Sequence, residues 1–175
     1  MAVAKVYLSI GSNIDRERHI TAALDALAEN FSALKISSVY ESEAVGFAGD
    51  HFLNLVVGFD TDMTVGVLSA CLRTIEHANG RARGQERFSA RTLDIDILTY
   101  GDCVGEIEGV LLPRAEILEN AFVLLPLAEI APDCQHPLSR QSFAALWRAY
   151  GKQQKLWPID FVWRGRHISH RHAVE

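Results

Sequence analysis

Two aspartates at alternate positions of one predicted strand are the residues whose types and spacing most clearly indicate chemistry. The segment 93–98 reads LDIDIL, and side chains two positions apart in a strand share a face and lie roughly 6.5–7 Å apart. Like charges on one face repel each other unless a cation lies between them, and Mg²⁺ binds a few carboxylate oxygens together with water and phosphate oxygens. Asp94 and Asp96 therefore indicate a divalent-metal site. The alternative is a solvated strand face with two exposed acids.

An arginine-rich segment precedes these aspartates. Residues 73–91 contain five Arg and two Glu, a local charge of +3. The planar guanidinium binds phosphate oxygens in pairs, so the segment favours a polyphosphate ligand beside the metal site. A solvated loop that balances an acidic body is the alternative. The sequence has neither G-x-x-x-x-G-K-[ST] nor G-x-G-x-x-G, which excludes a nucleotide site of the P-loop or Rossmann type.

A third candidate cluster lies at the start of a predicted strand over 52–61. Phe52, Asn54 and Val56 share one face of this strand, whereas the opposite face is entirely apolar. An aromatic ring can stack on a flat heterocycle, and an amide offers both a donor and an acceptor to the edge of such a ring. The pair therefore indicates a heterocycle site, and ordinary packing is the alternative.

The elements that must position these residues follow from hydrophobic periodicity. Period-2 alternation predicts strands over 6–10, 34–43, 52–61 and 93–100. Apolar residues spaced by three and four predict a helix over 15–30 and another that begins after Thr64 and stops at Asn79-Gly80. Further helices are expected over 121–130 and 142–150. The order is β-α-β-β-α-β followed by helices, which predicts an α+β fold with a ferredoxin-like βαββαβ core, an antiparallel sheet and added C-terminal helices.

Length and charge predict one domain with an extension. The chain has 175 residues, enough for a single core, and we expect a body over 1–150 and a basic C-terminal extension over 151–175. Residues 1–139 carry 10 Lys and Arg against 20 Asp and Glu, a charge of -10, whereas residues 140–175 carry 7 against 2, a charge of +5. The acidic body argues against a general nucleic-acid binder, which would present a basic face to phosphates.

The cysteines and the hydropathy pattern predict a cytoplasmic protein without a membrane span. The three cysteines are odd in number and too far apart for a CxxC motif or a disulfide framework. No apolar run approaches the roughly 18 residues that a spanning helix needs.

Several motifs in chain order resemble one enzyme family. They are GSN at 11–13, FLN at 52–54, IE at 75–76 followed by GRxR at 80–83, RTLDIDIL at 91–98 and FVLxPLxEIAP at 122–132. Together they resemble the 6-hydroxymethyl-7,8-dihydropterin pyrophosphokinase family over about residues 4–137. The resemblance implies an enzyme of folate biosynthesis that transfers pyrophosphate from ATP to the hydroxymethyl group of a reduced pterin and releases AMP.

The resemblance also implies roles for individual residues, each at a position that matches a family motif. It implies a catalytic set in which the two carboxylates bind two Mg²⁺ ions and the arginines contact the triphosphate: Arg81, Arg91, Asp94 and Asp96. It implies a set near the nucleotide: Glu76, Arg83, Ile97 and Arg114. It implies a pterin-binding set in which two aromatic rings flank the pterin and an amide reads its edge: Val45, Gly46, Phe52, Asn54 and Phe122. The expected partners are pterin and ATP, with no nucleic acid or membrane, and the expected state is a monomer or a weak homodimer.

The chain departs from the family pattern around the nucleotide. Phe88 and Ala90 stand where the family has Trp and Pro, Arg114 stands for a His, and Asn120 stands for an Arg. The pterin-side loop T-x-P-x-G reads SEAVG at 42–46. Two alternatives to the family reaction therefore stay open: a paralogue that uses a modified pterin or another phosphate donor, and a non-catalytic pterin-binding protein.

Overall fold

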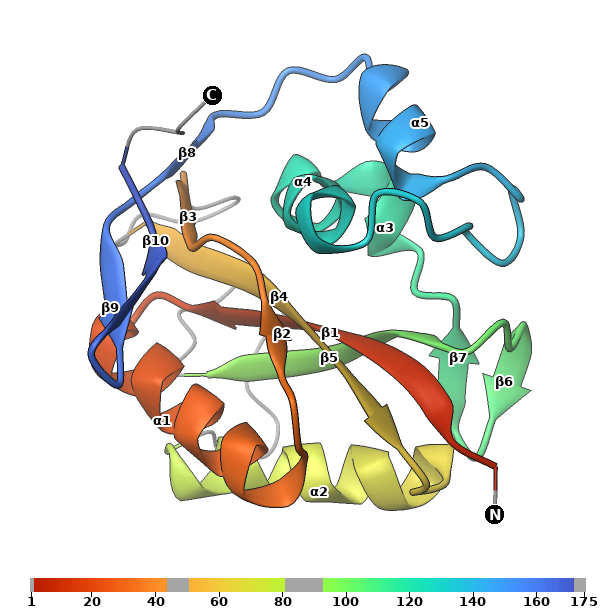
Figure 1. Cartoon of the computed structure of the whole chain (residues 1–175), viewed down its shortest axis with the longest axis horizontal. Coiled ribbons are helices and arrows are strands. Elements are labelled where there is room, and N and C mark those ends of the chain that lie inside the picture. The colour runs from red at the N-terminus through yellow and green to blue at the C-terminus, as the bar shows by residue number, and fades with distance from the viewer. Residues whose placement is uncertain (1, 44–50, 81–92, 172–175) are drawn as a thin grey trace.

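An antiparallel sheet forms the centre of the molecule, and helices cover both of its faces (Figure 1). The computed structural model describes residues 2–43, 51–80 and 93–171. The sheet has the order β5-β1-β4-β3-β8, and β2 pairs with β4 beside β3. The bounds of its strands are β1 Ala4–Ser12, β2 Lys35–Ile36, β3 Tyr40–Ser42, β4 Phe52–Thr61, β5 Asp94–Tyr100 and β8 Leu156–Pro158. With β2 and β3 taken together as the second strand, this order and the alternating helices confirm the predicted α+β, ferredoxin-like arrangement.

The predicted strand over 34–43 is divided because a side chain replaces the backbone in one part of the ladder. The Val56 backbone N–H donates to Ser37 Oγ at 2.9 Å, and the Ser37 N–H donates to the Val56 carbonyl at 2.9 Å. A hydroxyl that bonds to the neighbouring backbone competes with regular pairing. The expectation of one continuous strand was therefore wrong between Ile36 and Tyr40.

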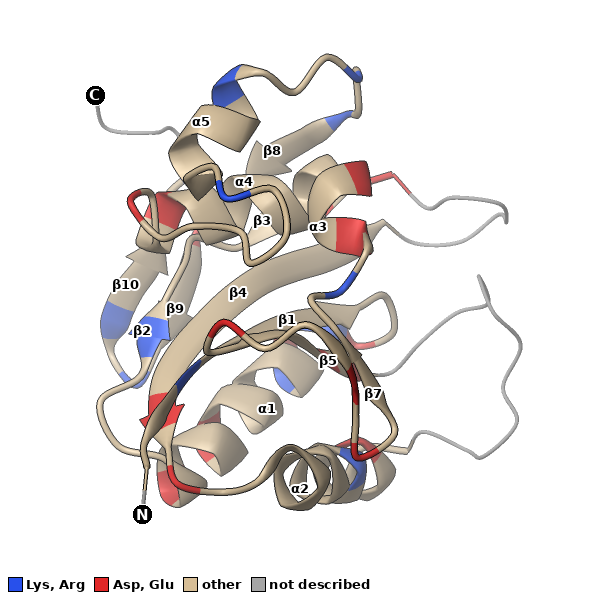
Figure 2. Ribbon diagram, turned by 90° about the vertical axis from the view of Figure 1, so that its right-hand side faces the viewer, with Lys and Arg blue, Asp and Glu red and all other residues tan. Residues whose placement is uncertain are grey.

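Helices α1 (Arg16–Asn30) and α2 (Val65–Ala78) cover one face of the sheet (Figures 1 and 2). Both begin and end where the sequence predicts, and Thr64 Oγ1 accepts from the Val67 N–H at the start of α2. Their apolar stripes pack against the inward residues of the central strands, which include Leu8, Leu55 and Ile95, each with no exposed surface. This larger core fixes which residues of β4 and β5 point to the opposite face.

Three helices cover part of that opposite face. They are α3 (Glu116–Glu119), α4 (Ala121–Ile130) and α5 (Phe143–Arg148), and α4 continues through Pro126. Glu129 anchors α4 to the sheet, because its carboxylate accepts from Ser38 Oγ and from Tyr40 Oη, both at 2.8 Å. Burial and the charge of Glu129 raise the pKa of Tyr40. The position of α4 over β4 therefore depends on a polar anchor as well as on apolar packing.

Several short strands were not predicted. β6 (Gly105–Ile107) and β7 (Val110–Leu112) form a hairpin after β5. In the predicted extension, β8 joins the sheet, and β9 (Phe161–Trp163) pairs with β10 (Arg166–Ser169). Phe161 and Trp163 are 5% and 6% exposed and belong to the larger core. Residues 156–169 are thus ordered, and residue 150 as a boundary between body and extension stays a prediction.

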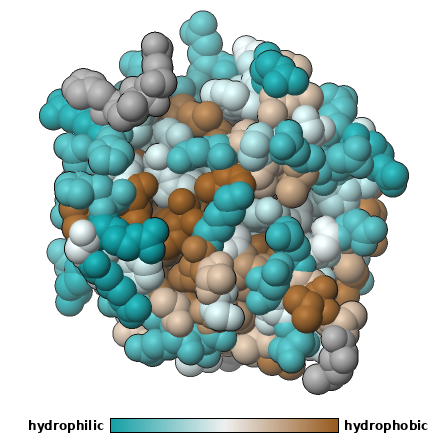
Figure 3. All heavy atoms as spheres, in the orientation of Figure 1, coloured by the Kyte–Doolittle hydropathy of each residue, from teal (hydrophilic) through white to brown (hydrophobic). Residues whose placement is uncertain are grey.

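The charges are dispersed over the surface, and the apolar atoms on one face are interrupted by hydrophilic side chains. Acidic and basic residues alternate over the described ribbon in Figure 2, with no broad basic face on the side shown. On the face shown in Figure 3, hydrophilic side chains cross and surround the apolar atoms.

All three cysteines are free. Among the described helices, none combines the length and the hydropathy that crossing a membrane requires.

We predict a pH-dependent contribution to stability where α1 meets β3. Arg16 Nη1 donates to Glu41 Oε2 at 2.6 Å. Burial raises the pKa of Glu41, but the hydrogen bond and charge of Arg16 outweigh burial, so this pKa is lowered. A lowered pKa in the folded state stabilises the protein above the ordinary pKa of Glu, and this contribution is lost as the pH falls through the lowered value. Melting curves should show wild type above Glu41→Gln at pH 7 and the two converging in acid. Glu29→Gln, an exposed control, should show no such convergence, and a constant gap for Glu41→Gln would contradict the prediction.

Candidate active site

Strand β5 places Asp94 and Asp96 on the sheet face that α1 and α2 do not cover. Leu93, Ile95 and Ile97 alternate with them and are buried in the larger core. Both carboxylate residues are partly exposed. The alternation that the sequence predicts is therefore present, and the carboxylates open toward the side of the molecule that carries β7 and α3.

A cross-strand row connects the aspartates to the candidate heterocycle site. In the ladder, Gly11 of β1 pairs with Asp94 on one side and with Asn54 of β4 on the other. Neighbouring strands lie about 4.8 Å apart, which puts Asp94 and Asn54 about 10 Å apart across the sheet. A Cβ at Gly11 would lie 2.9 Å from Asn54 Oδ1. The glycine thus leaves the space in which the Asn54 amide lies.

The Asn54 side chain is oriented by its neighbour on β3. Asn54 Nδ2 donates to Ser42 Oγ at 3.1 Å, and Ser42 lies opposite Phe52 in the β3–β4 ladder. Helix α4, which carries the half-buried Phe122 in its first turn, packs against β4. The two predicted aromatic residues and the predicted amide therefore lie on adjoining elements at one end of this face.

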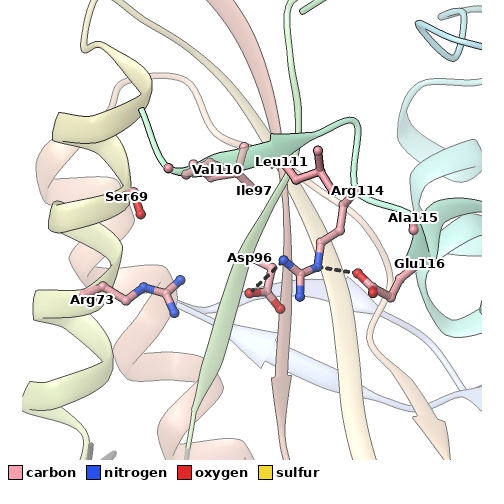
Figure 4. Close-up of a pocket in the computed structure, with 10 residues that line it drawn as sticks. Ser69, Arg73, Asp96, Ile97, Val110, Leu111, Arg114, Ala115 and Glu116 are labelled. Carbon is pink, nitrogen blue, oxygen red and sulfur yellow. Dashed lines mark ion pairs between the residues drawn. The ribbon is translucent and has the colours of Figure 1, made fainter. Parts of the chain in front are cut away.

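A cavity of about 380 Å³ lies beside Asp96 (Figure 4). Helix α2 contributes Ser69 and Arg73 to its lining, and β5 contributes Asp96 and Ile97. The other lining residues come from the segment that runs from the β6–β7 turn through β7 to the first residue of α3. Figure 4 shows Arg73 on one side of the Asp96 carboxylate and the Arg114 guanidinium on the other. Such a cavity offers positive groups on two sides of a carboxylate.

Arg114 lies between two acids. Its Nη1 is 3.7 Å from Asp96 Oδ1, and its Nε forms an ion pair with Glu116 Oε2. Burial and the charge of Asp94 raise the pKa of Asp96, whereas the charges of Arg114 and Arg73 act in the opposite direction. The Asp96 side chain is 19% exposed. The two aspartates thus form a negative centre that the nearby arginines compensate only in part.

Arg73 and Glu76 hold the free edge of β5. The Ile95 N–H donates to Glu76 Oε2 at 2.7 Å, and Arg73 Nη2 donates to the Ile95 carbonyl. Arg73 Nη1 also lies 2.7 Å from Glu76 Oε1, and only 1% of the Glu76 side chain is exposed. One helix therefore supplies the donor and the acceptor that a neighbouring strand would offer to Ile95. Glu76 does not line the cavity; it positions the residue between the two aspartates.

The two carboxylates fit a Mg²⁺ site. Within residues 2–43, 51–80 and 93–171, no group of three or more His, Cys, Asp and Glu side chains could hold a metal ion. Mg²⁺ does not need such a group, because it is held by one or two carboxylates and keeps water and substrate phosphate oxygens as its other ligands. Asp94 and Asp96, with an adjoining cavity, provide that donor set.

Part of the predicted site lies outside the described residues, namely Val45, Gly46, Arg81, Arg83 and Arg91. Phe88 and Ala90, two of the departures from the family pattern, lie outside them as well. Of the other predicted residues, Asp96, Ile97 and Arg114 line the cavity, and Asp94 lies two positions before Asp96 on β5. Phe52, Asn54 and Phe122 lie near β3 and α4.

Sequence reasoning missed Arg73 and Glu116 as neighbours of the aspartates. Arg73 had a signal, since it precedes Glu76 by three positions on a predicted helix and such residues share a helix face. No sequence signal indicated that Glu116 lies near the aspartates, because α3 has only four residues and shows no periodicity.

Comparisons with known proteins agree on one family. A family model described as 7,8-dihydro-6-hydroxymethylpterin-pyrophosphokinase (HPPK) matches residues 7–132. The 2-amino-4-hydroxy-6-hydroxymethyldihydropteridine pyrophosphokinase of Methylorubrum extorquens is 40% identical over 136 residues, which are 75% of this chain and 85% of that protein. The protein of the same name from Aquifex aeolicus is 38% identical over 143 residues, which are 79% of this chain and 88% of that protein.

Solved structures support the same fold. The wild-type HPPK-DHPS of Plasmodium falciparum with SDX-DHP superposes with a TM-score of 0.66 at 13% identity, over 85% of this chain and 44% of that one. The chain thus spans less than half the length of that larger protein. The family-model match over residues 7–132, with the identity and coverage of the Methylorubrum and Aquifex relatives, shows that the chain belongs to the 7,8-dihydro-6-hydroxymethylpterin-pyrophosphokinase family.

Proposed function

We propose that this enzyme transfers pyrophosphate from ATP to the hydroxymethyl group of 6-hydroxymethyl-7,8-dihydropterin and releases AMP, a step of folate biosynthesis. The observation that carries the proposal is the row Asn54–Gly11–Asp94 across three strands. An amide that can read a heterocycle edge and a pair of carboxylates that can bind Mg²⁺ lie on one sheet face, about 10 Å apart. The names of the relatives support the same reaction.

At the pterin end of the site, the side chains would recognise the flat shape of the pterin ring and its hydrogen-bonding edge. Phe52 and Phe122 would flank the flat ring, and the Asn54 amide, held by Ser42, would pair with the ring edge. With the edge at Asn54, the hydroxymethyl arm points along the row toward Asp94. A hydroxyl held close to its phosphorus target reacts with a much smaller entropic cost than a free one.

At the nucleotide end of the site, the side chains would neutralise the negative charge of the phosphates. Asp94 and Asp96 would hold two Mg²⁺ ions, which supply charge neutralisation and orientation of the phosphates when bound. The substrate hydroxyl oxygen forms a bond to the β-phosphorus, the bond from this phosphorus to the α–β bridging oxygen breaks, AMP leaves and the hydroxyl proton passes to solvent. Arg114 and Arg73 flank the cavity and would stabilise the anionic phosphates. Arg91 and Arg81 are proposed on their family motif alone.

The direct test is product analysis with purified protein. We expect AMP and the pterin pyrophosphate in equal amounts when ATP, Mg²⁺ and 6-hydroxymethyl-7,8-dihydropterin are all present, and neither product when one is omitted. Release of AMP with a different pterin only, or of the corresponding nucleoside monophosphate with a different nucleotide only, would favour the diverged paralogue. Pterin binding with no turnover for any pair would favour the non-catalytic alternative and contradict the proposal.

We predict that Gly11→Ala weakens pterin binding more than it destabilises the fold. The new Cβ would lie 2.9 Å from Asn54 Oδ1, so the amide at the end of that side chain must move while the β1 backbone stays in place. Misplacing one hydrogen-bonding group costs about 1 kcal/mol, or roughly fivefold in pterin affinity. Isothermal titration with 6-hydroxymethylpterin measures this loss. An unchanged affinity would contradict the proposed role of Asn54.

Pterin and ATP are the expected small-molecule partners, with no nucleic acid. The monomer or weak homodimer and the cytoplasmic location predicted from the sequence stay predictions, and sedimentation and cell fractionation are the measurements that check them.

A further inference from the structure

The C-terminal segment 154–158 contacts both sides of the proposed pterin site. We propose that this segment is a brace that sets the distance between the Asn54 side and the Phe122 side, and that its residues Gln154 and Trp157 are positioning residues for pterin binding. The inference rests on the proposed function, because it assumes that pterin lies between these two sides. It assigns a role to a part of the chain outside the family match at 7–132.

On the first side, the segment extends the sheet next to Asn54. β8 pairs with β3, so that Leu156 lies opposite Ser42 and Trp157 lies opposite Glu41. Ser42 is the residue whose hydroxyl accepts the hydrogen bond from Asn54 Nδ2. The position of the Asn54 amide therefore depends on β3, and one edge of β3 is held by β8.

The Trp157 side chain adds a second link to this side. Its Nε1–H donates to Glu41 Oε1 at 3.0 Å, while the other oxygen of this carboxylate accepts from Arg16. Arg16 also donates to the His51 carbonyl at 2.9 Å, and the His51 ring lies edge-on to the Trp157 ring with centroids 5.7 Å apart. His51 directly precedes Phe52. The indole thus fixes the backbone at the start of β4, where one of the flanking aromatic residues lies.

On the second side, the segment supplies a helix cap. The Ala121 N–H at the start of α4 donates to Gln154 Oε1 at 2.6 Å. Asn120, the N-cap residue of α4, forms no capping hydrogen bond through its side chain. A free N–H at a helix start needs an acceptor, and the C-terminal segment provides it. Phe122 is the next residue, so Gln154 holds the turn from which this ring projects.

The two sides are joined by very few residues. Only three peptide steps separate Gln154 from Trp157, and an extended chain spans at most about 3.6 Å per residue, so the Cα atoms of the two anchor residues lie within about 11 Å of each other. Glu129 already holds the other end of α4 to Ser38 and Tyr40. Loss of either anchor in the segment therefore frees the Phe122 end of α4, or the β3 edge, to move relative to the other side.

The test compares two tryptophans that make the same bond. Trp157 and Trp163 each donate an indole N–H to a carboxylate at 3.0 Å, to Glu41 and to Asp25 respectively. Trp163 lies in the core beside α1, away from the proposed site, and is the matched control. We expect Trp157→Phe to weaken 6-hydroxymethylpterin binding about three- to tenfold, with a less than twofold change in the affinity for a non-hydrolysable Mg-ATP analogue. Trp163→Phe should leave the pterin affinity unchanged, even where it lowers the melting temperature.

Gln154 allows a rescue experiment at the other anchor. Gln154→Ala removes the acceptor for Ala121 and should weaken pterin binding, whereas Gln154→Glu keeps an oxygen in place and should restore it. Pterin affinities that follow melting temperature equally in all four variants would show a merely structural role and overturn the inference.

A ligand-free measurement separates this inference from the proposed function. The NMR signals of the Asn54 side-chain amide and the Ala121 N–H report the two sides directly. We expect Trp157→Phe to shift the first, Gln154→Ala to shift the second, and Trp163→Phe to shift neither. If wild type binds no pterin but these shifts occur, the proposed function fails and the brace stands as a structural element. Unchanged signals in both brace variants would overturn the brace itself.

Discussion

Asp96→Ala is expected to lower the rate of AMP formation by at least about 10³-fold, and Asp94→Ala should have a similar effect. Loss of a single preorganised group that stabilises transition-state charge typically costs 10²–10³ in rate, and each of these carboxylates would help to hold Mg²⁺, which would neutralise charge on the reacting phosphates. A product assay with saturating ATP, Mg²⁺ and pterin measures the effect.

The same variants should fold as well as wild type. Two like charges on one strand face destabilise a sheet, so removing one of them relieves repulsion, by about 0.2–1 kcal/mol. We therefore expect unchanged or higher melting temperatures together with lost activity. Asp102→Ala is the matched control, because Asp102 is an exposed acid in the turn after β5, and it should retain activity. Full activity in both Asp94→Ala and Asp96→Ala would refute the metal-binding role.

Glu76→Ala is expected to destabilise the protein by about 3 kcal/mol. The substitution leaves the buried Ile95 N–H without its acceptor and leaves Arg73 without its ion-pair partner. An unsatisfied buried donor costs about 1–3 kcal/mol, and the loss of the Glu side chain adds a packing term. Because 42% of the Arg73 side chain is exposed, solvent screens the ion pair, which therefore adds little. For a chain of this size the melting temperature should fall by roughly 6–12 °C.

A conservative variant separates the two functions of Glu76. Glu76→Gln keeps an oxygen that can accept from Ile95 but removes the negative charge, so about 1 kcal/mol should be lost. Glu106, an exposed acid on β6, provides the control, and Glu106→Ala should stay within about 0.5 kcal/mol of wild type. Chemical denaturation of the three variants gives the comparison. Equal losses for Glu76→Ala and Glu106→Ala would show that Glu76 does not hold the edge of β5.

The central elements could be predicted because they repeat a hydrophobic period over many residues. β1, β4 and β5 have seven to ten residues, and α1 and α2 have 15 and 14. The elements that were missed are the short ones. β6 to β10 have three or four residues each, which is too few to establish alternation, and their positions depend on partners far away in the chain.

In the candidate site, too, the features that local geometry determines could be predicted, whereas those that depend on distant contacts could not. That Asp94 and Asp96 share a face follows from strand geometry alone, and so does the shared face of Phe52 and Asn54. The proximity of Arg114 to Asp96, by contrast, depends on the turn after β7, whose path no local pattern encodes. The motif predicts Glu76 near the nucleotide, and this stays a prediction. Its carboxylate contact with the backbone of β5 is a separate feature that no local pattern indicates.

The hydrogen bonds of Val39 have a consequence for how the chain folds during synthesis. This residue lies in the break between β2 and β3, and its N–H and carbonyl both bond to Ser169 Oγ, 130 positions later. The Val39 carbonyl also accepts from the Ile159 N–H at 2.9 Å. Until residues 159–169 have left the ribosome, the Val39 backbone therefore has none of these partners and must bond to water. Contacts between such distant residues form late because of the entropy of closing the intervening loop. In a nascent chain, the backbone between β2 and β3 would therefore stay exposed to water until the C-terminal strands are synthesised and pack against it.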